Sequence, residues 1–80
     1  MIAVITGTSS GIGRATAKLL ASKGVKVYGL SRTIVENEDF ESIACDVTNH
    51  EQTAEILKQI AEKEGRIDAL INNAGIGISG

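Results

Sequence analysis

The sequence predicts an α/β fold, namely the N-terminal half of a doubly wound parallel sheet. Three observations point to it: short apolar runs alternate with helix-like segments, a glycine-rich turn follows the first run, and a fourth apolar run closes the series. Alternating strands and helices imply βαβ units with right-handed crossovers. We therefore expect one partial domain over residues 1–80, with spatial strand order 3-2-1-4.

The first strand and helix flank the glycine-rich turn. Residues 2–6 form an apolar, β-branched run, typical of a buried parallel strand. After the turn at 7–13, side chains recur at helical spacing, and Gly24 is expected to end the helix. The residues that recur at this spacing are Ile12, Ala15, Thr16, Leu19, Leu20 and Lys23.

Two further strands and a second helix follow. Residues 25–30 and 42–45 are expected to be strands, and the polar stretch 33–41 between them a loop. Thr48 and Glu51 match a capping box that would open the second helix, which Gly65 would end. The apolar face of this helix comprises Ile56, Leu57, Ile60 and Ala61.

The fourth strand, residues 69–71, runs into Asn72-Asn73-Ala74-Gly75. Its apolar sequence suits the centre of a sheet, yet the predicted order leaves it at an edge, where a bare apolar strand is a liability. The sequence therefore indicates half of a larger sheet.

Composition narrows the class of protein. The chain is 42% apolar and 22% charged, with a net charge of −2, so it lacks the basic balance that nucleic-acid binding requires. No apolar run approaches the length of a membrane span, and the N-terminus has no basic leader region. A single cysteine, Cys45, excludes an internal disulfide and favours a reducing compartment, so we expect a cytoplasmic protein.

The glycine turn is the most informative motif. Glycines between a strand and a helix permit a tight turn, close approach of backbone to phosphate and close helix–strand packing. A helix N-terminus then offers free N–H groups to a pyrophosphate. An NTPase phosphate loop is excluded, because its second glycine would fall on Ile12 and its lysine is missing after Gly13.

Three blocks together resemble the short-chain dehydrogenase/reductase family: residues 6–13, then Asp46-Val47, then residues 72–75. The resemblance implies a Rossmann-type fold that binds a nicotinamide dinucleotide. It places the pyrophosphate and riboses against the glycine turn, the adenine beside Asp46 and Val47, and the adenosine ribose over residues 73–75. Asn72 would brace the sheet. The implied cofactor-binding residues, with two serines that add hydroxyl donors, are Gly7, Ser9, Ser10, Gly11, Ile12, Gly13, Asp46, Val47, Asn73, Ala74 and Gly75.

Each block also has a simpler interpretation. The glycine turn could be a tight connection that binds nothing, and Asp46 could merely help to end the third strand. The Asn-Asn-Ala-Gly stretch could be an ordinary turn, because Asn and Gly tolerate positive φ. Cys45 is interpreted as a small buried hydrophobe and His50 as a solvated residue.

The end of the second strand bears on the choice of cofactor. Dinucleotide folds that bind NAD carry an acidic residue there, whereas an arginine suits the 2′-phosphate of NADP. Here the acidic position holds Ser31 and is followed by Arg32, which favours NADP over NAD, the second choice. Three acidic residues in the following loop would weaken the positive potential of Arg32 if the loop folds back: Glu36, Glu38 and Asp39.

The family's catalytic Ser and Tyr-x-x-x-Lys have no counterpart in the sequence. Tyr28, the only tyrosine, lies in a predicted strand and is followed four residues later by Arg32. We therefore assign no catalytic and no metal-binding residue, and expect residues 1–80 to be an inactive part of a larger, homo-oligomeric oxidoreductase acting on a small alcohol or carbonyl. A self-standing, non-catalytic NADP(H)-binding module is the alternative, and the apolar fourth strand favours the enzyme.

Overall fold

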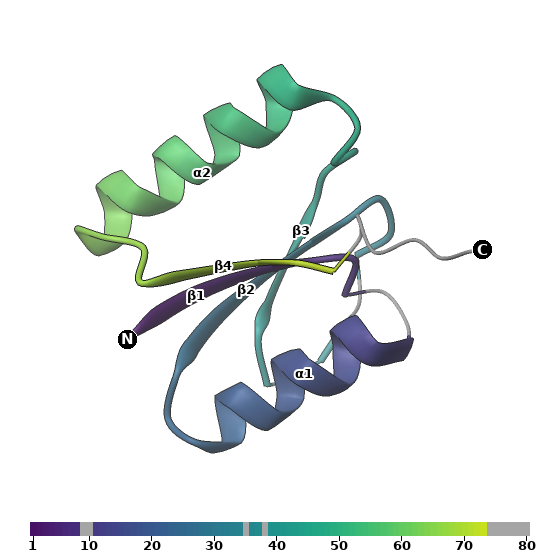
Figure 1. Cartoon of the computed structure of the whole chain (residues 1–80), viewed down its shortest axis with the longest axis vertical. Helices are drawn as coiled ribbons and strands as arrows, with labels where there is room; N and C mark the ends of the chain where they lie inside the picture. Colours follow the sequence, from purple (N-terminus) through teal and green to yellow (C-terminus); the bar gives the residue numbers. More distant parts are fainter. Residues whose placement is uncertain (9–10, 35, 38, 74–80) are drawn as a thin grey trace.

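A computed structural model describes residues 1–8, 11–34, 36–37 and 39–73 of the chain. Within them, parallel strands form one sheet in the order β3-β2-β1-β4. Helix α1 (Gly11–Ser22) covers one face of the sheet and α2 (His50–Glu64) the other, giving three layers (Figure 1). The strands are β1 (Ile2–Thr6), β2 (Lys26–Ser31), β3 (Glu41–Ala44) and β4 (Ala69–Asn72). The predicted fold class and strand order are confirmed.

Strand β1 is buried along its whole length because it has a strand on each side and a helix on each face. Its side chains alternate between two cores, as the pleat of a strand requires. On the α2 face, Ile2 and Val4 pack with Leu30, Cys45 and Ile60. On the α1 face, the core comprises Ile5, Ala17, Val27 and Phe40. Cys45 is buried with a free thiol, which confirms its interpretation as a core residue.

The middle strands are shifted by one residue from the predicted ranges. Strand β2 begins at Lys26, because the amide of Val25 donates to the carbonyl of Leu20 and so belongs to the turn that ends α1. Strand β3 begins at Glu41, which lies opposite Tyr28 in the parallel register. The predicted alternation of elements is unaffected by these shifts.

The helix predicted from the spacing is confirmed as α1, but the residues that gave the spacing do not all face the sheet. Ile12 and Leu19 are 76% and 56% exposed, and the residues that α1 buries are Gly13 and Ala17. Small residues face the sheet because α1 lies very close to β1 at its first turn. Leu20 is half-buried against the core.

The predicted capping box at Thr48 is also wrong. The N-cap of α2 is Asn49, whose Oδ1 accepts from the Gln52 amide at 3.1 Å. Thr48 precedes the helix and directs its hydroxyl to Asp46 instead. The predicted end is confirmed: Gly65 adopts φ 87° and its amide donates to the Ala61 carbonyl at 2.8 Å.

A polar cluster joins the end of α2 to the start of β2. The Tyr28 hydroxyl donates to Glu64, and Lys26 Nζ lies 2.7 Å from the same carboxylate. Burial, followed by the bond to Glu64, raises the pKa of Tyr28, while Lys26 and Tyr28 together lower the pKa of Glu64. Tyr28 therefore serves as a structural link at the end of the sheet where β2 begins.

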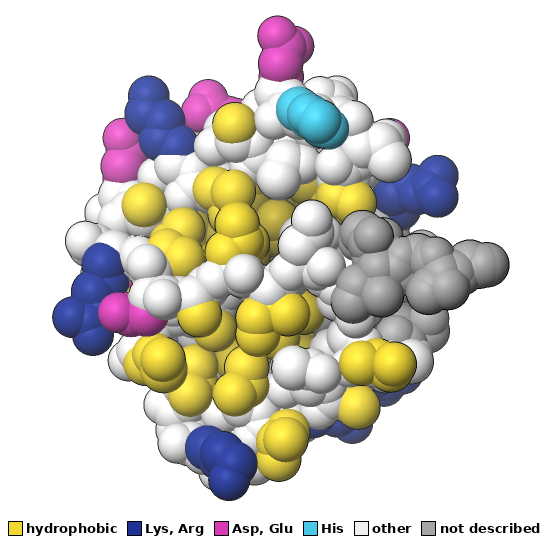
Figure 2. Space-filling view, viewed as in Figure 1, with side chains coloured by type: hydrophobic (Ala, Val, Ile, Leu, Met, Phe, Trp, Pro, Cys, Tyr) yellow, Lys and Arg dark blue, Asp and Glu magenta, His cyan; other side chains and the backbone are white. Residues whose placement is uncertain are grey.

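Strand β4 forms an edge whose surroundings are apolar. Among the described residues it pairs with β1 alone, and Leu70 is 54% exposed. Hydrophobic side chains gather over β4 and the flanking parts of both helices in Figure 2. Unpaired strand groups beside apolar surface provide a template for pairing with another chain.

A protein consisting of residues 1–80 alone is therefore expected to self-associate through β4. Replacing Leu70 with Lys would place a charge on this edge and is expected to reduce the association without altering the buried core. Light scattering on both proteins measures the effect. A monodisperse monomer formed by the unmodified 80-residue protein would contradict the expectation.

Candidate functional site

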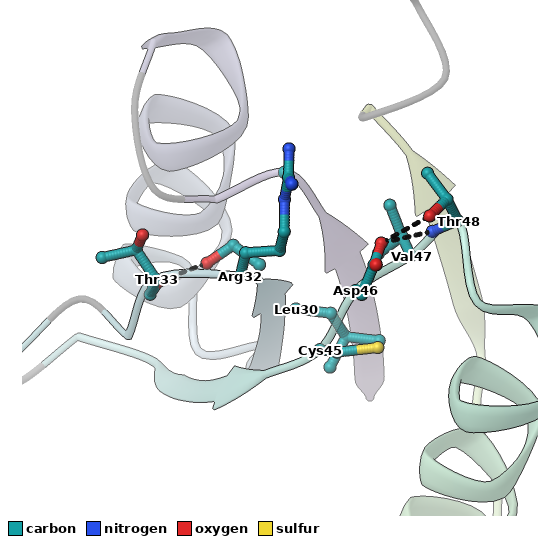
Figure 3. Close-up of a pocket in the computed structure, with 9 residues that line it drawn as sticks. Leu30, Arg32, Thr33, Cys45, Asp46, Val47 and Thr48 are labelled. Atoms are coloured by element: carbon teal, nitrogen blue, oxygen red, sulfur yellow. Dashed lines mark hydrogen bonds between the residues drawn. The ribbon is translucent and has the colours of Figure 1, made fainter.

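A pocket of about 590 Å³ lies at the carboxyl ends of the central strands. In an open α/β sheet, ligands bind in a crevice outside the carboxyl ends of the strands. The turn after β1 and the loops after β2 and β3 supply the walls (Figure 3). The lining residues are Gly7, Leu30, Ser31, Arg32, Thr33, Cys45, Asp46, Val47 and Thr48.

The structure brings together part of the predicted site. Five predicted residues line the pocket: Gly7, Ser31, Arg32, Asp46 and Val47. Others are described but lie outside its lining: Gly11, Ile12, Gly13 and Asn73. The predictions for Ser9, Ser10, Ala74 and Gly75 fall outside the described residues.

Glycine is required for the backbone of the turn after β1. Gly7 and Gly11 have φ values of 74° and 64°, in the left-handed region that side chains disfavour. A Cβ on Gly13 would lie 2.1 Å from the Gly7 carbonyl oxygen, so only glycine permits this approach of α1 to β1. A Cβ on Gly11 would meet no described atom within 4 Å, which leaves open space in front of the helix start.

The end of β4 is connected to the same turn. The Asn73 side-chain amide donates to the Gly7 carbonyl at 3.3 Å. The neighbouring Asn72 accepts a bond from the Thr6 hydroxyl at 3.0 Å and so links β4 to β1, as predicted. The position of the glycine turn thus depends on a strand 66 residues further along the chain.

The wall formed after β2 carries a positive charge. Ser31 is buried and its hydroxyl donates to the Thr33 carbonyl at 2.5 Å, which closes a tight turn. Arg32 and Thr33 are exposed at the rim of the pocket, and Figure 3 shows the Arg32 side chain extending from the loop after β2. Among the described residues, Arg32 makes no ion pair. The guanidinium is therefore available to an anion.

The opposite wall, after β3, carries Asp46. Its Oδ1 accepts from the Thr48 hydroxyl at 2.6 Å and from the Thr48 amide at 3.0 Å. The Asp46 amide donates to the Gln52 side chain at 3.1 Å. The Thr48 hydroxyl, its amide and the more distant Arg32 charge lower the pKa of the Asp46 carboxyl, which is therefore ionised at neutral pH.

Sequence reasoning did not identify four of the lining residues. Leu30 and Cys45 are buried at the base of the pocket. They could have been identified from the sequence, because each ends a predicted strand. Thr33 and Thr48 give no such signal, because a threonine in a polar turn is ordinary. Their contribution depends on contacts that appear only in the folded loops.

No metal centre or membrane span is found in the described part of the chain. Its His, Cys, Asp and Glu side chains form no group of three or more that could hold a metal ion. Neither described helix has the length and apolar character needed to cross a membrane.

Comparisons with known proteins agree with this architecture. The family model for short chain dehydrogenases matches residues 1–80. A 3-ketodihydrosphingosine reductase of Bacteroides thetaiotaomicron is 46% identical over 80 residues, which are 99% of this chain but 30% of the reductase.

Solved structures give the same result. Ligand-free aldohexose dehydrogenase of Thermoplasma acidophilum superposes with a TM-score of 0.87 at 38% identity, covering 90% of this chain and 28% of that enzyme. A metagenomic short-chain oxidoreductase in complex with NADP gives 0.84 at 34% identity, covering 96% and 40%. The chain thus spans well under half of each of these relatives. Because the family model matches residues 1–80 of this chain, the chain belongs to the short-chain dehydrogenase family.

Proposed function

We propose that this chain binds NADP(H) in the pocket after β1–β3, as the cofactor-binding part of an oxidoreductase that interconverts an alcohol and a carbonyl. The observation that carries the proposal is the glycine turn after β1, in which Gly7 has a left-handed backbone and lines a pocket at the carboxyl ends of the strands. Membership of the family and the NADP complex of one structural neighbour support it.

The turn fits a pyrophosphate. The space in front of Gly11 lies where α1 begins, and the first amides of a helix have no partners within the helix. These N–H groups and the positive end of the helix dipole favour an anion. We assign Gly7, Gly11, Ile12 and Gly13 to the phosphates and the adjoining riboses, together with Ser9 and Ser10.

The rest of the pocket fits an adenosine. Val47, which is partly exposed in the pocket lining, provides apolar surface for a flat ring, and Asp46 provides an ionised acceptor for the adenine amine. Asn73, Ala74 and Gly75 are proposed to lie beneath the adenosine ribose. Asn73 already contacts the glycine turn, which supports its place at this end of the sheet.

Arg32 is the reason to prefer NADP(H) over NAD(H). Its charge stands at the lip after β2, where the 2′ position of the adenosine ribose is expected, and the Ser31 side chain is turned toward the Thr33 carbonyl. Neither Ser31 nor Thr33 would repel a phosphate dianion. A guanidinium pairs with phosphate through charge-assisted hydrogen bonds.

The bound cofactor would supply the hydride, and residues 1–80 would bind and orient it. A proton donor near the reacting carbonyl is also needed. Tyr28 is committed to Glu64 where β2 begins, and His50 is exposed at the start of α2. A non-catalytic NADP(H)-binding module is the second candidate.

Replacing Ser31 with Asp is expected to reverse the cofactor preference. The charge-assisted contact to Arg32 is worth roughly 1.5–3 kcal/mol, so the unmodified protein should favour NADP(H) by roughly 10–150-fold. A carboxylate at this position would repel the 2′-phosphate. Titration of both proteins with NADPH and NADH measures the change, and equal affinities in the unmodified protein would contradict the assignment to Arg32.

Replacing Gly11 with Val is expected to abolish cofactor binding while the secondary structure stays near native. The side chain would occupy the space assigned to the pyrophosphate. Gly24→Val is the matched control, because Gly24 also has a positive φ (86°) and an open Cβ position but lies at the other end of α1. Both variants carry left-handed strain of about 1–2 kcal/mol.

Calorimetric titration with NADPH and circular dichroism separate strain from loss of the site. The control variant should retain binding at the original affinity. If Gly11→Val still bound NADPH at the original affinity, the assignment of the pyrophosphate to this turn would be wrong.

A protein consisting of residues 1–80 is expected to show no dehydrogenase activity. It would position the cofactor without a donor for the substrate oxygen or a pocket for the substrate. The assay combines the purified 80-residue protein with NADPH and a panel of ketones and follows NADPH absorbance. Turnover above the protein-free rate would show that the catalytic group lies within these residues after all.

A further inference from the structure

The Thr48 side chain is the most unexpected feature of the pocket. Its position in the sequence suits a helix cap, but Asn49 takes that role and leaves the Thr48 hydroxyl free for another partner. That partner is Asp46 Oδ1, at 2.6 Å, and the Thr48 amide reaches the same oxygen at 3.0 Å. Both donors thus converge on one atom of the carboxylate.

The second carboxylate oxygen of Asp46 is left without a partner among the described residues. Oδ2 receives no hydrogen bond from them, and Asp46 lines the pocket together with Val47. Figure 3 shows Thr48 and Asp46 side by side on the wall opposite Arg32. The Gln52 side chain fixes the backbone of Asp46 from the other direction, at 3.1 Å.

We propose that Thr48 is a positioning residue that turns Asp46 so that Oδ2 accepts from the 6-amino group of adenine and rejects a 6-oxo purine. The inference rests on the proposed cofactor function and assigns a base selectivity to that site. An ionised carboxylate can only accept hydrogen bonds, so it matches an amine and repels a carbonyl oxygen. The donors from Thr48 keep the carboxyl ionised, since they lower its pKa.

The hydroxyl, more than the bulk of Thr48, is expected to matter. Without it, Oδ1 would retain only the amide bond, and the carboxylate could rotate and share its acceptors between the backbone and the base. Thr48→Val removes the hydroxyl at nearly constant volume, whereas Thr48→Ser retains it. Thr16→Val is a matched control, since Thr16 lies on α1 outside the pocket lining.

The test uses the full-length protein that contains this chain, titrated with NADPH and with its hypoxanthine analogue. If the protein binds NADH better, NADH and the corresponding analogue replace them. The measured quantity is the ratio of the two dissociation constants. The unmodified protein and Thr16→Val are expected to favour adenine by at least about tenfold, as for a hydrogen bond to a charged group.

Thr48→Val is expected to lower this ratio by about fivefold, the usual effect of one lost hydrogen bond, and Thr48→Ser to restore it. A ratio unchanged by Thr48→Val, or a serine variant as impaired as the valine variant, would overturn the role of the hydroxyl. Equal binding of both nucleotides by the unmodified protein would overturn the selectivity itself. Binding of neither nucleotide would instead refute the proposed cofactor function, so the two failures are distinguishable.

Discussion

The approach of α1 to β1 at Gly13 is the constraint on which the rest of the structure depends. With the Cβ position of this residue 2.1 Å from the Gly7 carbonyl oxygen, any other amino acid would push the helix away from the sheet. The approach sets where α1 begins, and therefore where its free amides lie relative to the pocket. It also explains why α1 buries Gly13 and Ala17 while larger side chains such as Ile12 face outward.

The two walls of the pocket have opposite charge and are stabilised differently. Arg32 projects from a turn that is closed by the bond from Ser31 to the Thr33 carbonyl. Asp46 is held by hydrogen bonds with Thr48 and Gln52, just before α2 begins. A ligand that carries an anionic group near one wall and a hydrogen-bond donor near the other would complement both. The adenosine end of NADP(H) has this arrangement, with its phosphate and its exocyclic amine on different parts of the molecule.

The order of the strands could be predicted from the sequence because the apolar runs of β1 and β2 are stable only in the buried centre of a sheet. Sequence reasoning also predicted the pocket residues Gly7, Arg32, Asp46 and Val47, since the glycine turn and the strand ends identify one edge of the sheet. The inward stripe of α1 could not be predicted by hydrophobicity, because close packing selected for small size instead. The predicted cap of α2 was wrong for a local reason: Asn and Thr are both good caps, and Thr48 bonds instead to Asp46, two residues earlier in the chain.

The bond from Asn73 to the Gly7 carbonyl couples the conformation of the glycine turn to the pairing of β4 with β1. Local opening of β4 would remove this contact and the Thr6–Asn72 bond together, and the turn would lose its support from the far side of β1. A ligand that binds only the supported turn must then stabilise the β1–β4 pairing by mass action. Binding at the turn would therefore protect the amides of β4 from hydrogen exchange, although β4 lies outside the pocket lining.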